Sequence, residues 1–157
     1  FYVITYAVTT LGAFGVVQVV EDATGSDSIE SFAGLSRRAP VLSLCLLVFL
    51  LSLGGIPPLA GFIGKFFVFS AAAGADAGQL GLLWLVVLAI AMSAVSFYYY
   101  LRVLKAAYVA DAANGCQGIK VPGLTLIALV ILAAMVALLG CAPGLLMDAL
   151  QAAAASP

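Results

Sequence analysis

The stretch PVLSLCLLVFLLSLGGIPPLAGFIGKFFVFSAAA, residues 40–73, decides how this chain folds. It is almost wholly apolar and carries one charge, Lys65. As a single straight helix rising about 1.5 Å per residue, its roughly 34 residues would reach about 50 Å. A bilayer core is only about 30 Å thick and needs about 20 residues. The stretch therefore has to be broken or shortened.

The break is visible as Gly54-Gly55-Ile56-Pro57-Pro58. Each proline removes a backbone donor and clashes with the preceding turn, and glycine weakens a helix. The pattern predicts two half-helices, about 41–53 and 59–73, joined by irregular backbone. Such backbone survives at membrane depth only where protein buries it or where it lines a wet cavity.

Lys65 lies about two turns into the second half-helix, within Gly61-Phe62-Ile63-Gly64-Lys65-Phe66-Phe67. A lysine inside a membrane span is costly and points first to a function. The alternative is a lysine near a helix end whose ammonium reaches the membrane surface. Apolar residues flank Lys65 for more than a turn on both sides, and no other charge lies between Arg38 and Asp76. These flanks favour a functional role.

Composition places the whole chain in a membrane. Of its 157 residues 65% are hydrophobic and 8% charged, with mean hydropathy +1.23, whereas soluble domains carry about 25% charged residues. We therefore expect an all-α, polytopic membrane helix bundle. Phe1 opens inside an apolar run without a start methionine, so we expect the C-terminal part of a longer protein.

Metal, redox and nucleic-acid functions find no support in the sequence. Cys45, Cys116 and Cys141 are isolated, and the chain has no histidine, which leaves no metal-ligand spacing and excludes histidine-ligated haem within this chain. The six basic residues are scattered, so nucleic acid is not an expected partner. We expect no cofactor and no metal in this chain.

We expect four spans, at about 1–20, 41–73 (broken), 79–108 and 122–146, in a single membrane domain over 1–157. A short amphipathic helix on the membrane surface, about 28–36, is expected between the first two, where Asp27 and Glu30 resemble a capping box. In the first span Thr5, Thr9 and Gly12 share one face, which is typical of close helix packing. In the third, Ser93 and Ser96 belong to a weakly polar stripe, which either binds water beside Lys65 or simply packs.

Basic residues set the expected orientation. They fall in the 21–39 loop and in the 109–121 loop with its flanks, whereas the turn at 74–78 and the C-terminal tail carry none. By the positive-inside rule the two basic loops face the cytoplasm, and the turn and the C-terminus face the opposite side.

The chemistry that these residues suggest is proton relay. Burial penalises the ammonium form of a lysine and a carboxylate or water chain favours it, so a buried lysine can gain and lose a proton as its surroundings change. Broken helices provide free backbone groups and helix dipole ends at mid-membrane, where transporters bind ions. No carboxylate lies inside a span here, so any acidic partner has to come from other sequence or another subunit.

Several stretches also resemble one family. LSLGGIPPLAGFIGKFFVF (51–69) and FYYYLRVLKAAY (97–108) resemble subunit N of bacterial NADH-quinone oxidoreductase, respiratory complex I. TLGAFGVV (10–17) and SIESFAGLSRRAP (28–40) match the same family in the same order. The matches cover about residues 1–110. The pattern G-x-P-P-x-x-G-F alone would also fit the other antiporter-like subunits and Mrp-type antiporters.

The resemblance implies a fourteen-helix subunit with two inverted five-helix repeats, of which this chain supplies the last four helices. Lys65 would match the lysine on the second broken helix, a member of the hydrophilic axis that carries protons. The family subunit binds no NADH, flavin or iron–sulfur cluster, and quinone is handled at the level of the complex. The expected partners are other complex I membrane subunits and the lipid bilayer of the bacterial inner membrane.

Two other functions remain open at this point. One is an Mrp-type or hydrogenase-linked cation/proton antiporter subunit. The other is a purely structural membrane subunit, for which replacing Lys65 would be nearly silent.

Overall fold

The computed structural model describes residues 1–74, 83–111 and 118–144, and all regular structure in these ranges is helical. The helices are α1 (Tyr2–Thr24), the 3-10 helix η1 (Ile29–Phe32), α2 (Leu35–Arg38), α3 (Pro40–Gly54), α4 (Ala60–Gly74), α5 (Leu83–Tyr108) and α6 (Gly123–Cys141). By length and composition, α1, α5 and α6 can cross a membrane, whereas α3 and α4 are shorter apolar helices. The chain is therefore an all-helical membrane helix bundle.

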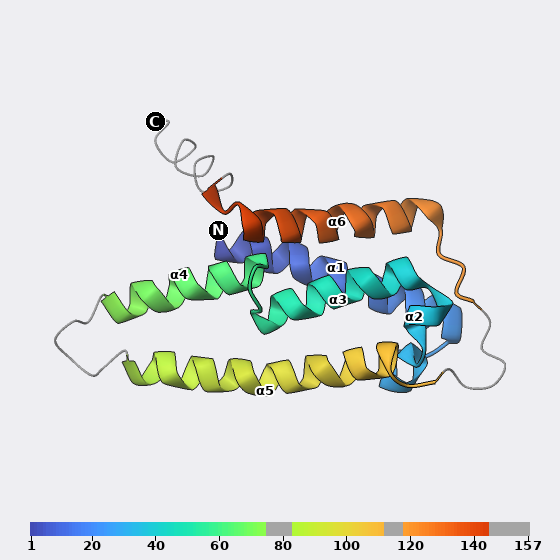
Figure 1. Ribbon diagram of the computed structural model, residues 1–157, viewed down its shortest axis with the longest axis horizontal. Coiled ribbons are helices and arrows are strands. Elements are labelled where there is room, and N and C mark those ends of the chain that lie inside the picture. The colour runs from blue at the N-terminus through green and yellow to red at the C-terminus, as the bar shows by residue number, and fades with distance from the viewer. Residues whose placement is uncertain (75–82, 112–117, 145–157) are drawn as a thin grey trace.

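Helix α3 lies at the centre of the bundle and contacts α1, α2, α4, α5 and α6. Helices α3 and α4 follow one another end to end, with α5 along one side and α1 and α6 along the other (Figure 1). The core side chains of α3 are fully buried, with Leu42 and Phe49 at 0% exposure and Leu46 at 1%. Val41 and Leu44 lie on the outer face of α3 at 45% and 56% exposure, so this apolar helix is buried on its core side and not all round.

The junction between α3 and α4 is irregular but hydrogen-bonded. Gly55 ends α3 with φ +82°, a left-handed conformation that glycine adopts without strain. Its N–H donates to the carbonyl of Ser52, and the N–H of Ile56 donates to the carbonyl of Leu51. Pro57 and Pro58, joined by a cis peptide bond, follow before α4 begins. The prolines lack N–H groups, so the turn leaves few backbone donors to satisfy.

At this junction a glycine lets the backbone of one helix approach the backbone of another segment closely. A Cβ placed on Gly140 of α6 would lie 2.5 Å from both the nitrogen of Ala60 and the carbonyl carbon of Leu59, and would overlap the carbonyl oxygen of Pro58. Helix α6 therefore lies directly against the broken segment and covers part of it. This close approach meets the requirement that irregular backbone at membrane depth be buried against protein.

The segment expected as one helix over 28–36 consists of two shorter pieces, η1 and α2. Gly34 separates them with φ +65°, and its N–H donates to the carbonyl of Ala106 on α5. Phe32 and Leu35 are buried at 3% and 0% exposure, so this segment is anchored in the bundle. The expected capping box is not formed, because Ser28 occupies the N-cap position and no side chain caps the helix.

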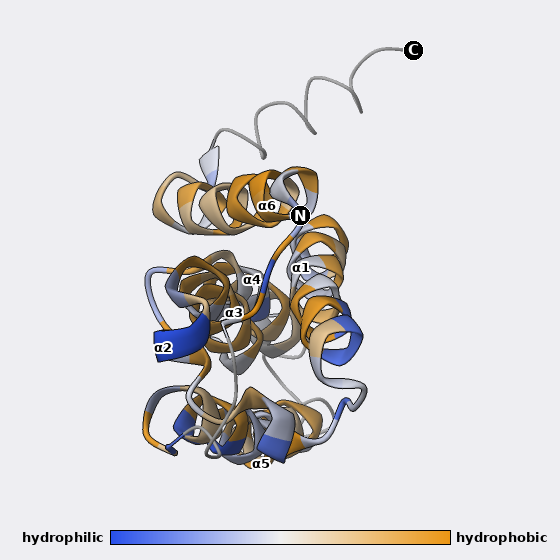
Figure 2. Ribbon diagram, turned by 90° about the vertical axis from the view of Figure 1, so that its right-hand side faces the viewer, coloured by the Kyte–Doolittle hydropathy of each residue, from blue (hydrophilic) through white to orange (hydrophobic). Residues whose placement is uncertain are grey.

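Charged residues gather at one end of the bundle. Figure 2 looks onto this end and shows hydrophilic residues at α2 and at the near ends of α1 and α5 around an apolar interior. Within the described ranges, Lys65 is the one charged residue away from this end. Residues 75–78 of the turn expected at 74–78, the central part of the 109–121 loop and the tail after residue 144 lie outside the described residues.

Candidate functional site

Lys65 turns back from α4 onto the end of α3. Its Nζ donates a hydrogen bond of 3.0 Å to the carbonyl oxygen of Leu53. That carbonyl belongs to the last turn of α3, where carbonyls have no partner within the helix. A Cβ on Gly55 would lie 3.3 Å from Cδ and 3.5 Å from Nζ of Lys65, so the lysine also packs along the glycine. Its position is set by the helix break.

The electrostatics of this contact favour a cation. The C-terminal end of a helix carries a partial negative charge, and a lysine there is stabilised by typically about 0.3–1 kcal/mol at an exposed surface and more where it is partly buried. Lys65 is partly buried and its bond to Leu53 is charge-assisted when the amine is protonated. The apolar residues around it oppose the charge. The end of α3 therefore favours the charged form of Lys65, whereas the apolar surroundings favour the neutral form.

Ser52 holds the start of α4 against the end of α3. Its Oγ accepts a hydrogen bond of 3.1 Å from the N–H of Gly61, one of the N-terminal amides of α4 that has no partner within its own helix. A Cβ on Gly61 would overlap the carbonyl oxygen of Ser52 and lie 2.7 Å from its carbonyl carbon. The two half-helices thus meet backbone to backbone. Sequence reasoning missed Ser52, because one serine in an apolar run gives no signal of its own.

A cavity of ≈ 460 Å³ opens beside Lys65 between α4 and α5. Its lining is largely apolar, with Lys65, Ser70 and Ser93 as its polar side chains. Of the two serines expected to line a wet stripe, Ser93 is therefore at the cavity. Ser96 is exposed and donates to the carbonyl of Met92, within its own helix. The structure brings Ser93 and Lys65 to one cavity and leaves Ser96 out of it.

A second, much smaller cavity of ≈ 10 Å³ lies on the other side of Lys65, between α1, α3 and α4. Thr5, Thr9 and Ser52 line it together with Lys65. The threonines were expected to form a small packing face, and they are indeed buried at 2% exposure each. The structure also places them beside the lysine, a neighbourhood that spacing along one helix could not predict.

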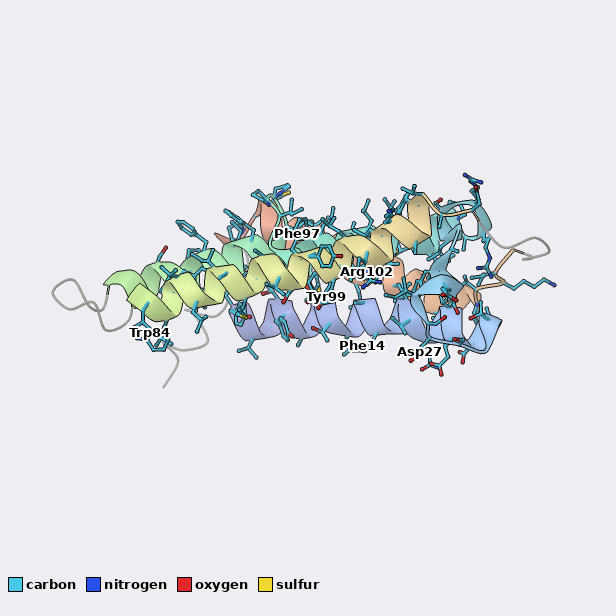
Figure 3. The ribbon with its side chains drawn as sticks, turned by 90° about the horizontal axis from the view of Figure 1, so that it is seen from below. Phe14, Asp27, Trp84, Phe97, Tyr99 and Arg102 are labelled. Carbon is cyan, nitrogen blue, oxygen red and sulfur yellow. The ribbon has the colours of Figure 1, made fainter. Side chains whose placement is uncertain are left out.

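Aromatic residues complete the surroundings of the break. Phe62 and Phe66 stack with ring centroids 6.2 Å apart and both line the larger cavity. Phe97 of α5, labelled in Figure 3, packs against the end of α3, where a Cβ on Gly54 would lie 2.5 Å from its ring. In the parts of the chain that the structure describes, no three His, Cys, Asp or Glu residues come close enough to hold a metal ion.

Comparisons with known proteins agree with this architecture. Residues 1–93 match the protein family described as "NADH:quinone oxidoreductase/Mrp antiporter, TM". The chain is 57% identical over 147 residues to NADH-quinone oxidoreductase subunit N 2 of Acidobacterium capsulatum, a match that covers 94% of this chain and 29% of that protein. It is 56% identical over 71 residues to subunit N 2 of Herpetosiphon aurantiacus, covering 45% of this chain and 13% of that protein.

A solved structure is also similar. A chain of respiratory complex I from Thermus thermophilus with bound aureothin superposes with a TM-score of 0.73 and 36% identity, over 92% of this chain and 33% of that chain. The chain thus spans a third or less of the length of the relatives it matches. Because the family match covers more than half of its residues, this chain belongs to the NADH:quinone oxidoreductase/Mrp antiporter membrane family, within which it matches part of subunit N.

Proposed function

We propose that this chain is part of a proton-translocating subunit N of NADH-quinone oxidoreductase in a bacterial membrane, and that Lys65 relays protons within it. The observation that carries the proposal is the contact of Lys65 with the carbonyl of Leu53 at the end of a broken helix, beside a cavity of ≈ 460 Å³. A lysine that is held by a hydrogen-bond acceptor and lies beside a cavity can pass a proton to water there and then take one up again. The similarity to subunit N over 94% of the chain supports the assignment.

In this proposal α3 and α4 together cross the membrane once, so that the chain makes four crossings with one broken near its middle. The end that gathers the 21–39 segment and the C-terminal end of α5 faces the cytoplasm, in accord with the basic residues there. The other membrane subunits of the complex are the partners. NADH, flavin, iron–sulfur clusters and quinone are handled by other subunits, and this chain holds no redox centre.

Two other functions predict different outcomes. An Mrp-type or hydrogenase-linked antiporter subunit belongs to the same broad family, and it would move cations without NADH oxidation. The genes beside this one would distinguish it, since a complex I operon encodes the redox subunits. A purely structural subunit would tolerate loss of Lys65.

The test is proton pumping by the whole complex in proteoliposomes, with assembly and NADH oxidation measured beside it. Lys65→Ala should assemble but lose coupled oxidation and pumping by at least about tenfold, as expected when a proton-transfer group is removed. Lys120→Ala, which removes an exposed lysine between α5 and α6, is the matched control and should pump normally. Normal pumping in Lys65→Ala would refute the relay and favour the structural function. Lys65→Arg then asks whether charge alone is enough.

A further inference from the structure

We propose that the small cavity on the α1 side of Lys65 is a binding site for one water molecule, which Thr5, Thr9 and Ser52 hold against the lysine. The cavity has a volume of ≈ 10 Å³, which is about what one water requires. It is separate from the larger, open cavity between α4 and α5. This inference rests on the proposed relay function and adds a second hydrogen-bonding partner for the relay residue.

The cavity is polar enough to keep a water. A buried water needs two to four polar partners. The side chains of Thr5, Thr9, Ser52 and Lys65 line this cavity, together with those of Tyr2 and Tyr6. Its inner wall is buried, since Thr5 and Thr9 are 2% exposed and Ser52 is 0% exposed, whereas Tyr2 and Tyr6 of the same lining are 37% and 52% exposed. An apolar cavity of this size would stay empty, whereas this one offers a complete set of donors and acceptors.

The hydrogen bonds already made decide what each group can offer. Thr5 donates its hydroxyl hydrogen to the carbonyl of Tyr2 at 3.0 Å, and Thr9 donates to the carbonyl of Thr5 at 2.6 Å. Both threonine oxygens therefore offer acceptor lone pairs only. Two acceptors on α1 are the partners that the two hydrogens of a water need.

Ser52 and Lys65 supply the complementary donors. Ser52 Oγ already accepts from the N–H of Gly61 at 3.1 Å, and among the described residues its own O–H has no acceptor. The Lys65 ammonium has three N–H groups, of which one donates to Leu53. The site thus has two donors and two acceptors, the arrangement that matches a water molecule.

A water at this position serves both protonation states of the lysine. The Leu53 carbonyl can only accept, so it gives no partner to the lone pair of a neutral amine. Water accepts from the ammonium, and after deprotonation it can turn and donate to the amine nitrogen. Thr5 and Thr9 act through this water as positioning residues, and the cost of leaving a buried polar group without a partner is avoided in either state.

The test is a high-resolution structure of the intact complex with the full-length subunit, together with pumping measurements on matched variants. We expect one ordered water within hydrogen-bond distance of the oxygens of Thr5 and Ser52. Thr5→Val keeps the shape and removes the hydroxyl, and it should lose this water and lower pumping about three- to tenfold, the factor that one hydrogen bond contributes. Thr5→Ser keeps the hydroxyl and should keep both the ordered water and the wild-type pumping rate. Thr9→Val is the second variant if Thr5→Val does not assemble.

Thr10→Val is the control, since the buried hydroxyl of Thr10 on the same helix has no partner among the described residues and lines a different groove. It should pump like the wild type. An empty cavity in the wild-type map, or full pumping in an assembled Thr5→Val complex, would overturn the water site. If Lys65→Ala stops pumping while Thr5→Val pumps normally, only the water site is wrong. If Lys65→Ala pumps normally, the relay is wrong, and the map still decides the water.

Discussion

Gly61→Ala tests whether backbone contact between the two half-helices fixes the position of Lys65. The added Cβ would lie 2.7 Å from the carbonyl carbon of Ser52, whereas ordinary contact begins at 3.4 Å. Backbone cannot rotate out of the way, so α3 and α4 must separate by at least about 0.7 Å. The bond from the Gly61 N–H to Ser52, now 3.1 Å, then stretches beyond the range of a hydrogen bond.

The expected cost follows from three terms. Overpacking costs about 1–3 kcal/mol and the lost hydrogen bond about 1 kcal/mol. The better helix propensity of alanine over glycine returns about 1 kcal/mol. The net cost is therefore about 1–3 kcal/mol, and 2 kcal/mol corresponds to roughly thirtyfold in a rate. We expect the half-life of the purified complex at elevated temperature to shorten by about that factor.

Gly74→Ala on the same helix is the control, because a Cβ there meets nothing within 4 Å. The assay compares half-life and protons pumped per NADH oxidised in the two variants. Gly61→Ala should also pump less, since Lys65 lies one turn further along α4 and moves with it. Equal half-lives and equal pumping in the two variants would refute the view that this contact sets the site.

Two more predictions concern residues around the break and at the charged end. Gly55→Ala puts a side chain at φ +82°, which costs about 1–2 kcal/mol, and the added Cβ would lie 3.3 Å from Cδ of Lys65. We therefore expect a shorter half-life of the complex and weaker proton pumping. Wild-type values of both would contradict this prediction. Arg37→Ala breaks the 2.8 Å ion pair between Arg37 and Asp111, whose side chains are 67% and 83% exposed, respectively. Because exposed ion pairs contribute less than about 1 kcal/mol, assembly and half-life of the complex should not change. Loss of assembly would contradict this prediction.

Hydropathy was enough to predict the all-helical membrane bundle. Apolar stretches of helical length have few other folds available in a bilayer, so the fold class follows from composition. The sequence also predicted interrupted helices around Gly54 to Pro58, and the structure has α3 ending at Gly54 and α4 beginning at Ala60. Glycine and proline change the conformation of the backbone at their own positions, so the helix ends that they cause can be predicted from the sequence.

Contacts across the break were not predictable in the same way. The bond of Lys65 to Leu53 depends on the direction in which α4 leaves the turn, and this is set by Gly140 of α6 and by Ser52. The stripe of Ser93 and Ser96 shows the same limit. Helical spacing placed both on one face, but only Ser93 lines the cavity beside Lys65. The function of Lys65 itself stays a prediction.

The 28–36 segment was wrongly expected as one surface helix. Its helical spacing of Ile29, Phe32 and Leu35 suggested a continuous amphipathic face. Gly34 adopts φ +65° and donates to the carbonyl of Ala106, so a contact with a distant helix outweighs the local periodicity. The conformation of such a short segment depends on the helices that it contacts, because a helix of a few residues has little stability alone.

The division of one apolar stretch into two short helices has a consequence for biosynthesis. Each of α3 and α4 has 15 residues, which is about 22 Å of helix, less than the roughly 30 Å of hydrocarbon to be crossed. Neither half can enter the bilayer as a stable unit by itself. In the proposed single crossing by α3 and α4, the stretch therefore has to insert whole, and α6, which is synthesised after α4 and α5, covers part of the turn through Gly140. Until α6 has been synthesised, the backbone of Pro58, Leu59 and Ala60 lacks the neighbour that Gly140 provides.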